Sequence, residues 1–128
     1  MTVKRIEALA DSLAKLNGAL DPMSEAYHSR NPGMLLAFSP KHARNSNGRR
    51  VFTSYAGGYE NLLLDLAIKA KGQSRAKLGP DSPLVDLLHT YGHSTSTLRY
   101  IVKFLRHALQ DENLPQTINL GWFLEGEE

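Results

Sequence analysis

Cysteine is absent from this 128-residue chain, and long unbroken apolar runs are absent too. Without thiols the chain has no disulfide, no thiolate nucleophile and no cysteine-ligated zinc, and its redox compartment stays open. The first residues lead into an amphipathic pattern, which predicts neither a signal peptide nor a membrane span. We therefore expect synthesis in the cytoplasm, with delivery by another route if the protein acts outside its cell, and no membrane partner.

Several signatures of chemistry are also missing. The chain has no Gly-x-Ser-x-Gly sequence, and Gly57-Gly58 lacks the further glycines and the lysine of a phosphate-binding loop. His89 and His93 have the four-residue spacing of metal ligands on a helix, but Gly92 interrupts that helix and no carboxylate nearby completes a ligand set. We expect no metal and no cofactor.

The residues that are present are typical of one globular domain. Hydrophobic residues make up 41% of the chain, which is enough for a core that needs no metal or disulfide to stabilise it. One domain is therefore expected over residues 1–128. The formal charge is +2, and basic residues are concentrated in segments 41–50 and 69–77. These segments form either a solvated rim or a contact with an acidic polymer. Aromatic residues are not interleaved with them, which disfavours nucleic acid as the partner.

Helical periodicity dominates the sequence. Apolar residues recur at spacings of three and four in segments 3–17, 54–71 and 95–109, which predicts three amphipathic helices. A fourth helix is expected over 82–91, with Ser82 as its cap and Pro83 in its first position. The apolar tail 118–124, which contains the only tryptophan, is expected to dock on the body. The pattern therefore predicts a mainly α fold.

A polar stretch interrupts this helical pattern. Apolar runs at 34–38 and 50–53 flank the polar residues 40–48, which predicts a loose β-hairpin or a pair of short extended segments. Asn31, Pro32 and Gly33 come just before the first run, and residues of these types dominate turns.

The sequence around this turn resembles a known family. It reads Leu16-Asn17-Gly18-Ala19 and then Ser24-Glu25-Ala26-Tyr27-His28-Ser29-Arg30-Asn31-Pro32-Gly33-Met34-Leu35. This order is similar to the core motif of lysozyme-like peptidoglycan-cleaving domains, which include lytic-transglycosylase-like and glucosaminidase-like proteins of phages and bacteria. In that family a helix ends in a Glu-Gly pair, and an Asn-Pro-Gly turn, a hairpin and a further helix follow.

The resemblance continues to about residue 118. Residues 48–54 resemble the return strand of the family's hairpin, and Gly58-Tyr59 resembles the Gly-aromatic pair that opens the next helix. Tyr91-Gly92 resembles a Tyr-Ala pair that ends a later helix, and Tyr100 matches a tyrosine of the last helix.

The resemblance implies an α+β, lysozyme-like helical fold with one small β-hairpin, and peptidoglycan or a related glycan as the partner. It implies a cleft between the first helix and the hairpin, with a carboxylic acid that protonates the leaving oxygen of a glycosidic bond. The residues that it implies at the glycan are Tyr27, Arg30, Asn31, Gly33, Tyr59, Tyr91 and Tyr100.

Asn17 occupies the position of the family's catalytic glutamate. An amide is not a general acid, and it does not stabilise an oxocarbenium ion by charge. Three interpretations remain open. The chain is an inactivated relative that still binds glycan, or Glu25 or Glu60 has taken over the acid role, or the scaffold now serves a protein–protein contact. The match leaves open whether the chain is an enzyme.

The candidate glycan-contacting and catalytic residues also have purely structural interpretations. In these, the turn residues and tyrosines are ordinary turn, core or rim residues, and Glu25 and Glu60 are charges favoured in the first turn of a helix.

A second resemblance runs through residues 82–105, which are similar to the later helices of death-domain adaptors, with Tyr91 where tryptophan is usual. It implies a protein–protein interaction module without an active site. We rank it second because a six-helix bundle has no place for the Asn-Pro-Gly turn and the hairpin.

Overall fold

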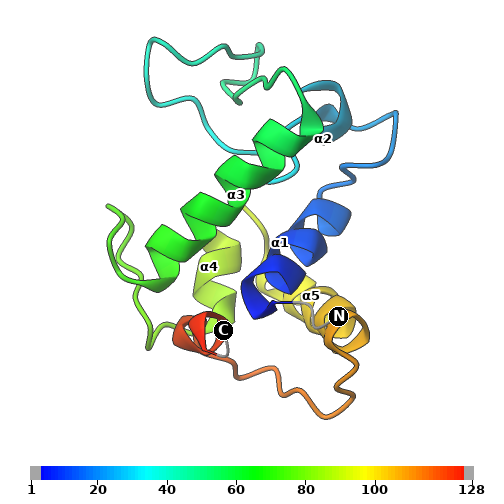
Figure 1. Cartoon of the computed structure of the whole chain (residues 1–128), viewed down its shortest axis with the longest axis vertical. Coiled ribbons are helices and arrows are strands. Elements are labelled where there is room, and N and C mark those ends of the chain that lie inside the picture. Colours follow the sequence, from blue (N-terminus) through cyan, green and yellow to red (C-terminus); the bar gives the residue numbers. More distant parts are fainter. Residues whose placement is uncertain (1–3, 126–128) are drawn as a thin grey trace.

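The computed structural model of the chain describes residues 4–125 and is mainly helical (Figure 1). The elements in chain order are α1 (Arg5–Leu16), α2 (Glu25–His28), α3 (Tyr55–Ala70), α4 (Leu84–Thr90), the 3-10 helix η1 (Thr95–Thr97), α5 (Leu98–Leu109) and the 3-10 helix η2 (Leu120–Leu124). The four helices expected from periodicity are confirmed within the described range, while α2 was not expected. No helix among residues 4–125 has the length and apolarity to cross a bilayer.

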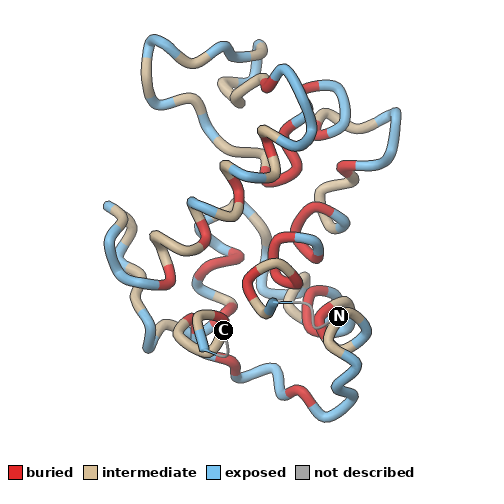
Figure 2. Tube along the Cα trace, in the orientation of Figure 1, coloured by how far each residue is buried: buried red, intermediate tan, exposed pale blue. Residues whose placement is uncertain are grey.

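One apolar core joins α1, α3, α4, α5 and η2. Its fully buried members include Leu9 of α1, Leu62 of α3, Leu87 of α4, Ile101 of α5 and Phe123 of η2. Figure 2 shows the buried residues gathered where these helices face one another, whereas residues 34–51 of the loop that precedes α3 are exposed or intermediate. Burying each large apolar side chain contributes about 1.5–3 kcal/mol. The expected docking of the tail is confirmed, because its apolar residues belong to this core.

The start of α4 differs from the sequence-based expectation. Pro83 is the N-cap and Leu84 is the first helical residue. The Ser82 hydroxyl instead accepts a hydrogen bond from the Gly79 backbone N–H at 3.0 Å. The expected cap at Ser82 was wrong because the chain here pairs with the tail. The Leu84 N–H donates to the Ile118 carbonyl at 2.8 Å, and this contact begins the helix one residue later.

Residues 34–50 form a pair of short extended segments, and no β-sheet is found in the described part of the chain. Antiparallel pairing is limited to isolated bridges, Leu36 with Arg49 and Arg44 with Arg50. Side chains replace part of the backbone ladder. The Asn45 carbonyl oxygen Oδ1, for example, accepts from the N–H groups of Asn47 at 2.9 Å and Arg49 at 3.1 Å. This segment extends beside α3 at one end of the molecule (Figure 1).

The turn formed by Asn31, Pro32 and Gly33 is buried against α3. A Cβ added at Gly58 on α3 would lie 2.1 Å from the carbonyl oxygen of Arg30, and one added at Gly33 would lie 2.6 Å from Leu62 Cδ1. Both distances are shorter than real Cβ contacts. The turn and the helix therefore approach each other this closely only because glycine stands at both positions.

Gly58→Ala is expected to lower the free energy of unfolding by at least about 2 kcal/mol, even after the ~1 kcal/mol by which alanine favours a helix. The new methyl group meets a backbone oxygen, which cannot rotate away as a side chain would. Gly57→Ala is the matched control on the same helix, because its nearest new contact is the Ser54 hydroxyl at 3.3 Å. Urea denaturation of both variants measures the difference. Equal stabilities would contradict the close approach.

Candidate functional site

Asn31 holds both arms of the 34–50 segment. Its side chain is 0% exposed. The Nδ2 group donates to the carbonyl oxygens of Leu35 and Arg50, each at 3.0 Å, and Oδ1 accepts from the Leu35 N–H at 2.9 Å. These bonds use both N–H groups and the oxygen of the amide. The Asn31 side chain thus supports the 34–50 segment from inside the protein, and none of its polar groups faces solvent.

Asn31→Ala is expected to destabilise the fold by about 3 kcal/mol, because it removes three hydrogen bonds and leaves buried backbone groups unsatisfied. Asn47→Ala is the control, since Asn47 is exposed and its amide donates only to Glu25, at 3.0 Å. Urea denaturation gives both values, and hydrogen exchange at the Leu35 and Arg50 amides reports on the segment itself. Similar losses in the two variants would contradict the supporting role of Asn31.

A hollow of about 730 Å³ lies between the 34–50 segment and the helices α3 and α4. The segment contributes Leu36 and Phe38, α3 contributes Leu64, and Tyr91 lies at the end of α4. Phe38 is 85% exposed and Leu64 is 60% exposed. Large apolar side chains with this much exposure at the edge of a concave surface are typical of a binding site.

Asp65 is the acidic residue in the lining of the hollow. It lies one helical turn before Lys69 on α3, and its Oδ2 atom accepts hydrogen bonds from both Lys69 Nζ and the Tyr91 hydroxyl. Lys69 Nζ also lies 4.6 Å from the centroid of the Tyr91 ring. Burial, followed by the neighbouring Asp65 carboxylate, raises the pKa of Tyr91 above its usual value, so the phenol stays protonated as a donor. The carboxylate is thereby compensated by one cation and one neutral donor.

Three arginines line the same hollow: Arg49, Arg50 and Arg75. Arg49 Nη1 donates to the Met34 carbonyl at 2.8 Å, and Arg50 Nη1 donates to Asn61 Oδ1 at 3.3 Å. Arg75 is an exposed residue of the loop after α3. Among the charged residues of the lining, the cations Arg49, Arg50, Lys69 and Arg75 therefore outnumber the single carboxylate, Asp65.

Two histidines have lowered pKa values. His42 lines the hollow, where partial desolvation, followed by the charges of Arg50 and Arg44, lowers its pKa below the usual 6.5. His93 follows α4; burial lowers its pKa, and its Nε2 atom is buried with no hydrogen-bond partner among residues 4–125. Both imidazoles are therefore neutral in the folded protein at pH 7.

The stability of the fold is expected to decrease on mild acidification. Unfolded histidines take up protons near pH 6.5, while those of the folded chain remain neutral to a lower pH. The unfolded state then binds more protons, so the stabilisation is complete above pH 6.5 and is lost as the pH falls through the folded pKa values. We expect the Tm to be lower at pH 5.5 than at 7.5, and His93→Leu to show a smaller decrease. A Tm that rises or stays constant on acidification would overturn this.

The three residues expected in catalysis lie outside the lining of the hollow. Asn17 Nδ2 donates to the Pro32 carbonyl at 2.9 Å. The Glu25 carboxylate accepts from the amides of Asn45 at 2.8 Å and Asn47 at 3.0 Å, and so fastens α2 to the 34–50 segment. Glu60 is exposed on α3. The structure thus gives Asn17 and Glu25 partners within the chain.

The residues expected to contact glycan are dispersed, and Tyr91 is the one among them that lines the hollow. Tyr27 and Arg30 are exposed around α2, and Gly33 is buried in the turn. Tyr59 donates to the Glu7 carbonyl at 3.4 Å. Tyr100 is 45% exposed on α5, where its hydroxyl accepts from Arg99 at 3.0 Å.

The sequence did not single out Asp65 or Phe38, and it marked Lys69 only as part of the basic segment 69–77. The i, i+4 spacing of Asp65 and Lys69 is visible in the sequence and marks an ion pair on a helix face. Nothing local indicates that Tyr91 joins this pair, because the contact spans two helices. The exposure of Phe38 likewise depends on how the segment lies against α3.

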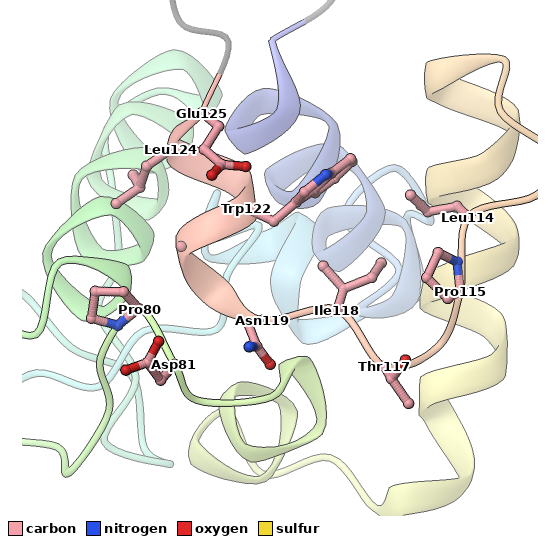
Figure 3. Close-up of a pocket in the computed structure, with 11 residues that line it drawn as sticks. Pro80, Asp81, Leu114, Pro115, Thr117, Ile118, Asn119, Trp122, Leu124 and Glu125 are labelled. Atoms are coloured by element: carbon pink, nitrogen blue, oxygen red, sulfur yellow. The ribbon is translucent and has the colours of Figure 1, made fainter.

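A second groove, of about 560 Å³, lies beside η2 (Figure 3). It contains the carboxylates of Asp81 and Glu125 and the side chain of Trp122. Arg5 covers Trp122, with its guanidinium 4.1 Å from a ring centroid, and lies 3.5 Å from the Glu125 carboxylate. This groove is acidic where the hollow is basic. Among residues 4–125 no group of three or more His, Asp or Glu side chains is arranged to hold a metal ion.

The chain matches no protein-family model, no curated protein and no solved structure.

Proposed function

We propose that the hollow binds a glycan of the peptidoglycan type and that the chain does not cleave it. The observation that carries this proposal is the position of the hollow. One of its walls is the 34–50 segment that follows the Asn-Pro-Gly turn, which is also one wall of the glycan cleft that the resemblance implies; its other walls are α3 and the end of α4 instead of the first helix, and Tyr91 is part of the lining. Its volume is within the range of ligand sites, about 300–1,000 Å³. The presence of a hollow at this position supports glycan binding over a protein–protein interaction module, because such a module does not need a hollow.

The chemistry of the lining suits a sugar ring. The exposed apolar side chains of Phe38 and Leu64 offer surfaces for the C–H face of a pyranose, and the amide of Asn61 and the ammonium of Lys69 offer partners for hydroxyl and N-acetyl groups. Ligand sites commonly combine a mostly apolar surface with a few polar groups that set orientation.

Binding without cleavage follows from the carboxylates. Glycosidases commonly use two carboxyl groups about 5–10 Å apart, one of them a proton donor. Asp65 is the carboxylate that lines the hollow, and it already accepts hydrogen bonds from Lys69 and Tyr91. The candidate acids Glu25 and Glu60 lie outside the lining. The arrangement therefore supports a binding site without a general acid.

The purified chain is expected to sediment with insoluble peptidoglycan and to release no soluble muropeptides. Phe38→Ala is expected to weaken this retention several-fold, because Phe38 lines the hollow, while its 85% exposure makes the fold insensitive to its loss. Met23→Ala is the matched control, since Met23 is 89% exposed and is not part of the lining. Absence of retention, or equal weakening by both substitutions, would contradict the proposed site.

The same assay separates binding from cleavage. Release of muropeptides by the unaltered chain would contradict the non-cleaving part of the proposal. Asn17→Glu tests whether the chain is an enzyme that lost only its acid. We expect no release from this variant, because position 17 lies outside the lining and faces the Pro32 carbonyl.

A further inference from the structure

We propose that the hollow selects saccharides that carry carboxylate groups over neutral saccharides, through Arg49, Arg50 and Arg75. This inference rests on the proposed function, because it names the class of glycan that the same hollow binds.

Two basic segments that are far apart in the sequence meet at the hollow. Arg49 and Arg50 come from segment 41–50, while Lys69 and Arg75 come from segment 69–77. If these segments formed only a solvated rim, nothing would require basic residues of both segments to face the same concavity. Their convergence favours the alternative in which these residues contact an acidic polymer.

The positive charge at the hollow is poorly compensated. Asp65 is the acidic residue of the lining, and Lys69 is already its partner. The ion pairs within 4.0 Å among residues 4–125 are Arg5 with Glu125 and Lys69 with Asp65, so none of the three arginines has a carboxylate partner there. Like charges that line one concavity attract counter-ions. A bound carboxylate would supply the charge that the fold does not.

The arginines also keep donors available for a ligand. A guanidinium has five N–H groups in a planar fork that matches a carboxylate. Arg49 uses Nη1 on the Met34 carbonyl, and Arg50 uses Nη1 on Asn61. Each of them therefore keeps further N–H groups. Arg75 is exposed in the loop after α3, and no hydrogen bond holds its guanidinium among the described residues.

Two tetrasaccharides of similar size separate charge from shape. Both contain N-acetylglucosamine: chitotetraose is neutral, and the hyaluronan tetrasaccharide also carries glucuronate carboxylates. In calorimetric titrations at 0.15 M salt, we expect the hyaluronan tetrasaccharide to bind about tenfold more tightly, because charge-assisted bonds to arginine are strong. We expect the difference to shrink at higher salt, where the charges are screened.

Arg75→Glu assigns this preference to the hollow. It is expected to weaken binding of the acidic tetrasaccharide about fivefold, in line with an exposed charge, and to weaken chitotetraose binding less than that. Lys77→Glu is the matched control, because it makes the same change in charge two residues away on an exposed side chain outside the lining. A control effect below about twofold would show that contact at the hollow, and not net charge, sets the preference. Equal effects of the two substitutions would overturn the inference.

The outcomes separate this inference from the proposed function. If the chain sediments with peptidoglycan but shows no preference for the acidic tetrasaccharide, the inference fails and the glycan site stands. If the chain does not sediment with peptidoglycan, the proposed function itself fails, whether or not a tetrasaccharide binds.

Discussion

The contact between the turn at residues 31–33 and helix α3 sets the position of everything around the hollow. The turn and the helix meet where Gly58 lies against the Arg30 carbonyl and Gly33 lies against Leu62. Asn31 is buried in this contact and hydrogen-bonds to both arms of the 34–50 segment. Because protein interiors are close-packed, the segment cannot move relative to α3 without breaking this contact.

The electrostatic character of the hollow follows from that contact. With the 34–50 segment held beside α3, its arginines face Lys69 and the loop that contains Arg75. Bringing these cations together does not by itself stabilise the fold, since like charges repel one another. Proteins commonly keep arrangements that do not favour stability at their functional sites. The excess of cations is therefore one reason why we propose the hollow as the site for an acidic glycan.

Two of the three side chains that suggested catalysis, Asn17 and Glu25, have structural partners instead, while Glu60 is exposed on α3. Glu25 is held by the amides of Asn45 and Asn47. Asn17 donates to the Pro32 carbonyl, so it ties the end of α1 to the same buried turn. A glutamate at position 17 would place a carboxylate beside that carbonyl oxygen and would have no proton to donate when ionised. Asparagine therefore suits this position as a support of the turn.

The sequence by itself determined the four longer helices, the turn and the docking of the tail, but not α2, because each of these depends on nearby residues or on a strong apolar pattern, as in α1 and α5. Only the tertiary structure decided that the turn is buried, that α4 begins at Leu84, and that residues 34–50 pair through isolated bridges. It also decided which side chains meet at the hollow: Asp65, Tyr91 and Arg75 come from different elements. These side chains come together through contacts between distant parts of the chain, which the local spacing of residues does not predict.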